Sequence, residues 1–353
     1  MSDPGMKVMI AGNFASNRGG LEESYAKAFE SLGCPVVRFE FGRAVSRSCR
    51  LGRFGRTFNR FVPVESWLRK ANRELVVAAL KEKPSMVIVA GQNPVTGGGL
   101  AQIAAALAAK RILLWPDTLL NVSDSLISAL PMYDLVACYG RLPCAIFGKL
   151  GAGAVEWVPL AGDPVLHPSL VTGNPRPSDY SCDVSFVGTW RPEREEALAA
   201  ICAIPEIRVK IWGDGNWKRF AGKNPMIMKA WQGKGLYGAE FSAAVAGSKI
   251  NLNVIDDTNY PSANMRFFEI PCAGGLEVSS PCPEMEPEFR DGETIFYYRK
   301  VKELPELIVK LLGDDKLRAD VTRRAHEKIL SGHTYRHRAD KILTALDSLQ
   351  GSS

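Results

Sequence analysis

The sequence predicts an α/β protein built from two doubly wound, Rossmann-like domains. Three observations lead to this fold class. Short apolar strands alternate with amphipathic helices in the first half, a Pro/Gly-rich stretch interrupts the pattern at about 160–181, and the alternation then restarts. Strands separated by helices imply right-handed crossovers and parallel sheets. A chain of 353 residues is long enough for two such domains, each with its own core.

In the first half, each expected strand is a short apolar run and each expected helix has apolar residues at helical spacing. The run 8–11 ends at Gly12, and Gly33 stops the helix that follows. The further strands expected here are 35–41, 86–90, 112–115, 135–138 and 155–158, and the helices are 21–32, 65–81 and 100–109.

The second half repeats this alternation and ends in helices. Its expected strands are 183–188, 207–212, 249–254, 276–279 and 294–298, and its expected helices are 191–202, 239–246, 301–312, 316–330 and 335–349. We therefore expect a first domain at 1–165, a linker at 166–181, a second domain at 182–332 and a terminal helix at 333–353.

The composition is that of a globular protein, with 46% hydrophobic and 23% charged residues. No apolar run approaches the roughly 20 residues needed to cross a bilayer, and the N-terminal residues show no signal-peptide pattern. We expect a cytoplasmic protein. The eight cysteines form no Cys-x-x-Cys pair, so neither a zinc ribbon nor a thioredoxin-like motif is supported.

Positive charge is concentrated in residues 38–73. This segment has ten Arg or Lys residues against two Glu, a balance of +8 in a chain whose net charge is +6. Aromatic residues are interleaved with these cations, which suits an anionic membrane surface at the inner face or a polyanionic acceptor. A solvated loop with inward-facing aromatics is the alternative. No nucleic-acid-binding module is visible, so we expect no nucleic-acid partner.

The most informative segment runs from Asn264 to a double glycine, Gly274 and Gly275. A carboxylate such as Glu269 can accept hydrogen bonds from both hydroxyls of a ribose, and glycines let backbone approach a phosphate closely. Arg266 adds a fixed positive charge suited to a diphosphate. The alternative is an ordinary capped helix in which Arg266 and Glu269 form a surface pair at i, i+3.

Two further segments predict turns over a nucleotide. Gly213 and Gly215 follow the strand at 207–212, although Lys218 replaces the third glycine of the dinucleotide fingerprint. The alternative is a tight turn with a buried tryptophan.

In the other segment, Gly188 and Thr189 follow a strand, and Arg194 could reach the same diphosphate or could simply be a solvated helix residue. Tyr237, just before the helix at 239–246, completes the expected donor-binding set.

In the first domain, Arg18, Gly19 and Gly20 connect the first strand to the first helix, where glycines allow backbone to approach a ligand. A flexible turn is the alternative. Asp117, just after the strand at 112–115, is the best-placed acid at a strand end and could equally cap the next helix. We expect no metal ion, because His333 and His337 lack a Glu-x-x-His context.

Three blocks in this order resemble the CgeB-like (spore maturation protein-like) proteins of the glycosyl transferases group 1. They are DVSFVGTWRPER at 183–194, NMRFFEIPCAGG at 264–275 and HTYRHRADKIL at 333–343. The resemblance implies a GT-B fold with two domains facing across a cleft and a final helix that returns to the first domain. It also implies a nucleotide diphosphate sugar as co-substrate, with no other cofactor.

The resemblance assigns roles to individual residues. It makes Glu269 the ribose-binding glutamate, and Arg194 and Arg266 the diphosphate contacts that replace a metal ion. Related retaining enzymes carry a second glutamate eight residues earlier, where this chain has Pro261, so the stereochemistry stays open. An inverting reaction would need a base, for which Asp117 is the candidate.

The acceptor implied by this reading could be a glycan, a lipid-linked molecule or a protein. Two alternative functions remain open at this point. One is a non-catalytic protein that binds a nucleotide or sugar, and the other is a nucleotide-sugar epimerase of the same fold.

Overall fold

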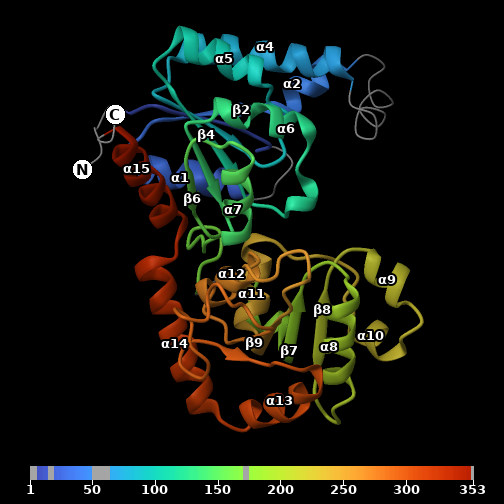
Figure 1. Cartoon of the computed structure of the whole chain (residues 1–353). Helices are drawn as coiled ribbons and strands as arrows, with labels where there is room; N and C mark the ends of the chain where they lie inside the picture. Colours follow the sequence, from blue (N-terminus) through green and yellow to red (C-terminus); the bar gives the residue numbers. More distant parts are fainter. Residues whose placement is uncertain (1–5, 15–19, 50–63, 170–174, 351–353) are drawn as a thin grey trace. The chain divides into compact units, whose positions relative to one another are not determined.

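The computed structural model describes residues 6–14, 20–49, 64–169 and 175–350, which form two compact units (Figure 1). The first unit comprises Met1–Pro159 and Tyr335–Ser353, and the second comprises Leu160–Thr334. The chain passes into the second unit after Pro159, whereas the sequence placed the end of the first domain at residue 165.

The first unit contains a parallel sheet of six described strands in the order β2-β1-β3-β4-β5-β6. The chain runs from β1 to β2 on one side and to β3 on the other, so the strand order reverses between β1 and β3. Every residue of β1, β3 and β5 is buried, as expected for parallel strands covered on both faces. The strands are β1 Val8–Gly12, β2 Val36–Glu40, β3 Met86–Ala90, β4 Lys110–Trp115, β5 Leu135–Cys138 and β6 Val155–Trp157.

Helices cover both faces of this sheet, including one from the end of the chain. They are α1 Leu21–Ser31, α2 Phe41–Ser48, α4 Glu65–Glu82, α5 Gly97–Ala106, α6 Asp124–Ala129, α7 Arg141–Lys149 and α15 Tyr335–Gln350, with 3-10 turns at Leu119–Asn121 and Leu130–Met132. Helix α15 packs on α1, where the rings of Tyr335 and Tyr25 meet edge-on with their centroids 5.1 Å apart. Lys341 Nζ also donates to Trp157 O at 2.7 Å, which ties α15 to β6.

The second unit contains a parallel sheet of five described strands in the order β11-β10-β9-β7-β8. The chain leaves β7 for β8 on one side and β9 forms on the other, so the order reverses between β7 and β9. The strands are β7 Cys182–Val187, β8 Val209–Trp212, β9 Ser248–Asn253, β10 Glu277–Ser279 and β11 Phe296–Tyr297.

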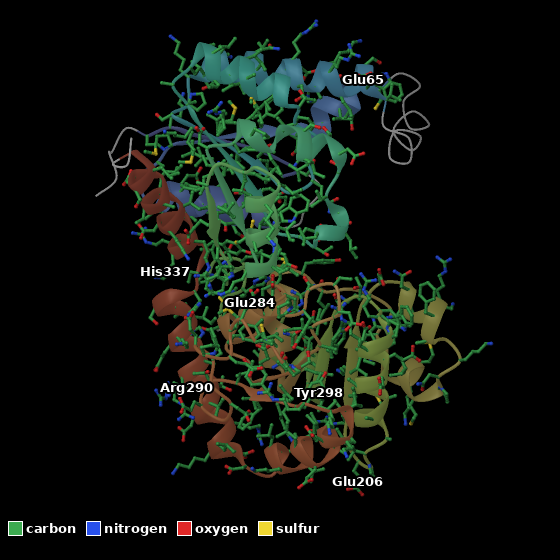
Figure 2. All side chains as sticks on the ribbon, in the orientation of Figure 1. Glu65, Glu206, Glu284, Arg290, Tyr298 and His337 are labelled. Carbon is green, nitrogen blue, oxygen red and sulfur yellow. The ribbon has the colours of Figure 1, made fainter. Side chains whose placement is uncertain are left out.

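The helices of the second unit are placed by ordinary start and stop signals. Pro192 lies in the first turn of α8, and Asp314 caps α14 by accepting from Leu317 N at 2.8 Å. Tyr298, labelled in Figure 2, is buried in the core just after β11. The helices are α8 Pro192–Cys202, α9 Asn216–Ala221, α10 Pro225–Ala230, α11 Gly238–Ala246, α12 Arg266–Cys272, α13 Leu304–Leu312 and α14 Asp315–Gly332, with 3-10 turns at Pro177–Tyr180 and Val301–Glu303. The predicted fold class, two doubly wound α/β units, is confirmed.

Two segments differ from the sequence prediction. The strand expected at 35–41 ends at Glu40, because Phe41 is buried as the first residue of α2, a helix that the sequence did not predict. The segment 160–169, expected in part as linker, packs on the second unit. Gly162 N donates to His333 O at 2.9 Å, and the His167 ring meets Phe241 edge-on at 5.0 Å.

Candidate functional site

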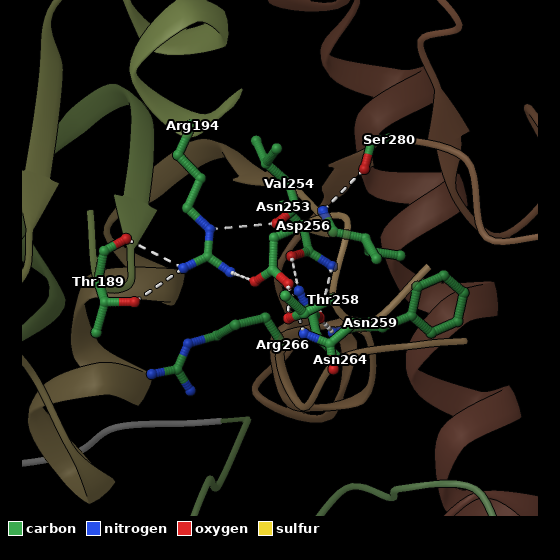
Figure 3. A network of polar contacts seen from close by, with 12 residues as sticks. Thr189, Arg194, Asn253, Val254, Asp256, Thr258, Asn259, Asn264, Arg266 and Ser280 are labelled. Carbon is green, nitrogen blue, oxygen red and sulfur yellow. Dashed lines mark hydrogen bonds and ion pairs between the residues drawn. The ribbon is translucent and has the colours of Figure 1, made fainter. Parts of the chain in front are cut away.

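Polar residues of the second unit gather at the carboxyl edge of its sheet, where the strand order reverses (Figure 3). Thr189 follows β7, Val254 follows β9, and α12 begins at Arg266 after the loop that leaves β9. Ligands of open parallel sheets bind beyond the carboxyl ends of the strands, next to such a reversal. The structure therefore brings the sequence-predicted residues Thr189, Arg194 and Arg266 to the position where a ligand is expected.

Arg194 occupies the centre of this edge and is 8% exposed. Its Nη2 pairs with Asp256 at 2.8 Å, its Nη1 donates to Thr189 O and Oγ1 at 3.1 and 3.0 Å, and its Nε donates to Val254 O at 3.4 Å. Figure 3 shows the guanidinium between Thr189 and Asp256. These contacts use four of the five N–H donors of the side chain, so Arg194 ties the loop after β7 to the loop after β9.

Asp256 is the carboxylate that neutralises Arg194. Burial alone would raise the pKa of Asp256, but hydrogen bonds from Thr258 and Asn259 and the charge of Arg194 hold it below its usual range. Burial also lowers the pKa of Arg194 despite the opposing charge of Asp256, yet an arginine stays protonated at neutral pH. The two groups therefore form a buried, charged pair.

Arg266 is held differently. Its Nε donates to Val187 O at 3.0 Å, its Nη1 pairs with Glu269, and its guanidinium lies over the Phe241 ring at 4.3 Å from the centroid. Its Nη2 has no hydrogen-bond partner in the part of the chain that the structure describes. The side chain is 26% exposed, so this fixed cation can accept an anion as a further partner.

Glu269 lies one turn further along α12 and is 4% exposed. Its Oε2 holds Arg266, while Oε1 has no hydrogen-bond partner among the described residues. The expected pair at i, i+3 therefore exists, but its glutamate is buried rather than on the surface.

His167 lies beside this pair and was not among the sequence-predicted site residues. Its Nδ1 is buried without a hydrogen-bond partner in the described chain. Burial lowers the pKa of His167, and the charge of Glu269 opposes this shift. The Pro/Gly-rich sequence around His167 indicated a linker, which concealed its contact with Phe241.

Asn264 joins a network that fixes the start of α12. It exchanges two hydrogen bonds with Asn253, at 3.1 and 2.8 Å, and its Oδ1 also accepts from Phe267 N at 3.1 Å. Asn253 donates in turn to Glu277 Oε1 at 2.8 Å. Burial raises the pKa of Glu277 well above its ordinary value, against the opposing effect of the hydrogen bond from Asn253.

The glycines after β7 and β8 pack these two loops together. A Cβ at Gly213 would lie 2.3 Å from both Gly188 O and Trp217 Nε1, and that indole N–H donates to Gly188 O at 2.9 Å. Only a glycine therefore fits at 213. Gly215 has open space around it and could approach a ligand, because a Cβ there would meet nothing within 4 Å.

Gly274 and Gly275 do not lie with the other predicted donor residues. They follow the C-terminal end of α12 and precede β10, whereas the other residues lie at the carboxyl ends of β7, β8 and β9. Gly274 takes a φ of +77°, which ends the helix, and a Cβ at Gly275 would lie 2.3 Å from Val245 Cγ1. The structure gives these two glycines a packing role in place of the expected phosphate contact.

Tyr237 directly precedes α11 and is 59% exposed. It lies at the carboxyl edge, because α11 leads back to the start of β9. Its ring is thus available to a flat ligand group.

In the first unit, Asp117 follows β4 and accepts hydrogen bonds from Gln92 Nε2, Thr118 N and Asn121 Nδ2. Gly20 immediately precedes α1 in an extended conformation. Arg18 and Gly19 lie outside the described residues. Within the described chain, no three His, Cys, Asp or Glu side chains come together as metal ligands would, and no helix is long and apolar enough to span a membrane.

Part of the chain matches a known protein family. Residues 191–344, less than half of the chain, match the family described as glycosyl transferase-like. No curated protein matches the chain. The likeness to the CgeB-like group thus stays a prediction.

Solved structures resemble the whole chain. Sucrose-phosphate synthase from Thermosynechococcus elongatus has a TM-score of 0.68 at 12% identity, over 99% of this chain and 100% of that one. A glycosyltransferase from Rickettsia africae gives 0.69 at 10% identity, over 99% of each chain. Anabaena HepE in complex with UDP-glucose gives 0.66 at 15% identity, over 97% of this chain and 100% of that one. The fold is that of the GT-B glycosyltransferases, with two Rossmann-like units.

Proposed function

We propose that this protein is a glycosyltransferase that moves a sugar from a nucleotide diphosphate sugar to an acceptor without a metal ion. The family match over 191–344 and the GT-B fold support this reading. One observation carries it further. The ion pair of Arg266 and Glu269 leaves the Nη2 amino group of the arginine and the Oε1 atom of the carboxylate without partners among the described residues. A diphosphate needs such a donor, and a ribose hydroxyl needs such an acceptor.

In the proposed reaction, the bond between the anomeric carbon and the diphosphate oxygen breaks while the acceptor hydroxyl forms the new bond. The transition state is oxocarbenium-like, as in glycoside hydrolysis. Arg266 Nη2 donates to the departing diphosphate, whose negative charge grows as the bond breaks. A fixed guanidinium thus supplies the stabilisation that a metal ion provides elsewhere, and Glu269 Oε1 accepts from the ribose.

Arg194 has a supporting role in this proposal. Because four of its donors meet protein acceptors, it holds Thr189 beside the diphosphate rather than binding the diphosphate itself. Tyr237 offers its ring to the nucleobase. If the reaction inverts the anomeric configuration, Asp117 is the proposed base that takes the proton of the acceptor hydroxyl. The acceptor is a glycan, a lipid-linked molecule or a protein, and the reaction takes place in the cytoplasm.

Thermal unfolding in the presence of EDTA tests the donor site. UDP, GDP, TDP and their sugars should be compared, since a ligand at 100 times its dissociation constant adds about 2.7 kcal/mol of stability. HepE is described with UDP-glucose, so the uridine compounds come first. Stabilisation by one nucleotide series in EDTA is expected. No shift with any compound would overturn the proposal.

Product analysis then separates the three functions. Release of the nucleotide together with a glycosylated acceptor is expected for a transferase. An altered sugar without any acceptor would identify an epimerase, and tight binding without turnover over a broad acceptor panel would identify a binding protein.

A further inference from the structure

A groove lies on the first unit between α2 and α4, and the proposed reaction does not use it. Its volume is about 840 Å³. Phe39 of β2 and Val77 and Ala78 of α4 line its apolar part. Figure 2 labels Glu65 at the start of α4, and long side chains extend outward from this helix.

The groove is strongly basic. Lys70, Arg73 and Lys81 of α4 line it, and none of them has an ion-pair or hydrogen-bond partner among the residues that the structure describes. The acidic side chain in the lining is Glu74, which is already paired with Arg47 of α2. The groove therefore presents an unbalanced positive charge.

Exposed apolar side chains lie on the same face of α4. Val77 is 58% exposed and Leu80 is 40% exposed. Positions 70, 73, 77, 80 and 81 share one face at helical spacing, while the opposite face, with Leu75 and Ala79, is buried in the core. A single exposed valine is ordinary. Exposed apolar residues between cations that have no ion-pair partner among the described residues, all on one face of a helix, are typical of a helix lying at a membrane interface.

We propose that this face of α4, together with the groove, binds the surface of an anionic lipid bilayer. The cations meet lipid phosphates, and Val77 and Leu80 enter the boundary between headgroups and acyl chains. A polynucleotide would use the cations but would leave the apolar side chains and groove floor without a partner. The proposal does not depend on the activity of the second unit.

Vesicle flotation with the full chain tests this proposal. The protein should bind phosphatidylcholine vesicles that contain about a third phosphatidylglycerol, should not bind phosphatidylcholine alone, and should dissociate as salt rises. Equal binding to both vesicle types, or binding to neither, would overturn it. Binding to a DNA duplex but not to vesicles would overturn it in favour of a nucleic-acid surface.

Matched variants locate the surface. The triple variant Lys70→Gln/Arg73→Gln/Lys81→Gln should bind anionic vesicles roughly 100-fold more weakly, since each cation near the surface contributes about a factor of five. The control Lys302→Gln/Lys310→Gln/Lys316→Gln removes the same charge from exposed positions of the second unit and should bind within a few-fold of the original protein. Equal weakening of both would show that only net charge matters and would refute the assigned face.

The apolar part is tested separately. Val77→Ser/Leu80→Ser should weaken binding about 10-fold, because two apolar side chains leave the interface. Val309→Ser/Leu330→Ser changes residues of similar exposure in the second unit and should have no effect. Unchanged binding by the first double variant would overturn insertion. Arg73→Gln alone gives a milder test should a multiple variant fail to fold.

Discussion

Arg266 and Glu269 form an ion pair across one turn of α12 in which Arg266 Nη2 and Glu269 Oε1 both stay without partners in the described chain. The arginine is further fixed by Val187 O and by the ring of Phe241. Such a side chain is ordered before a ligand arrives, so little conformational entropy is lost on binding. The pair is therefore the most informative place to test the proposed donor site.

Arg266→Ala should weaken UDP binding by 10- to 100-fold, since a hydrogen bond to a charged group contributes about 1.5–3 kcal/mol. Isothermal titration in EDTA measures this. The matched control is Arg290→Ala, because Arg290 forms an exposed i, i+3 pair with Glu293 in the same unit. Equal UDP affinity in Arg266→Ala and the control would remove the basis of the assignment.

Asp256→Asn should destabilise the second unit by about 3 kcal/mol, because it leaves Arg194 buried without a counter-charge. Urea unfolding followed by tryptophan fluorescence measures the loss. The neighbouring Asp257 is exposed, so Asp257→Asn is a matched control that should change stability by less than about 0.5 kcal/mol. If Asp256→Asn lowers the free energy of unfolding by no more than Asp257→Asn does, the ion pair of Arg194 and Asp256 contributes little to stability.

The parallel strands were predictable because a strand buried on both faces is a short continuous apolar run, as at β3 and β5. Helix α2 was missed because its eight residues follow β2 without a break, so that Phe41 continued the apolar strand pattern. Gly274 and Gly275 show a second limit. A double glycine can end a helix or approach a phosphate, and the sequence does not distinguish these uses.

The polar partners of the site were predictable only in part. Arg266 and Glu269 lie three residues apart, so helical spacing indicated their pairing. Arg194 lies in α8 and Asp256 lies in the loop after β9, 62 residues further along the chain, and only the strand order brings them together. Asp256 also starts a turn, since Asn259 N donates to its carbonyl oxygen at 2.9 Å.

Glu277→Gln should make the free energy of unfolding less sensitive to a rise in pH above about 5. Burial raises the pKa of Glu277 well above its ordinary value, so the folded state holds this proton to a higher pH than the unfolded state does. Its contribution to stability is full below the unfolded pKa of about 4.3 and is lost as pH rises toward the folded value. Glutamine keeps an acceptor for Asn253 and has no proton to lose.

Urea midpoints between pH 5 and pH 8 measure this effect. The midpoint should fall more steeply with pH in the original protein than in Glu277→Gln, and the exposed Glu306→Gln should follow the original protein. Parallel curves for all three proteins would contradict a raised pKa of Glu277 in the folded protein.

His167→Phe should have the opposite effect, at acid pH. Burial lowers the pKa of His167, with the charge of Glu269 opposing and that of Arg266 reinforcing the shift. As pH falls, the unfolded state therefore takes up a proton on His167 at a higher pH than the folded state does. Stability is lost as pH falls below about 6.5 toward the pKa that His167 has in the folded protein. Phenylalanine keeps the edge-on contact with Phe241 and removes both the titration and the unpartnered Nδ1. The difference in urea midpoint between His167→Phe and the original protein should grow from pH 7.5 to about pH 5. A constant difference over that range would show that His167 titrates equally in both states and that its burial beside Glu269 is not retained in solution.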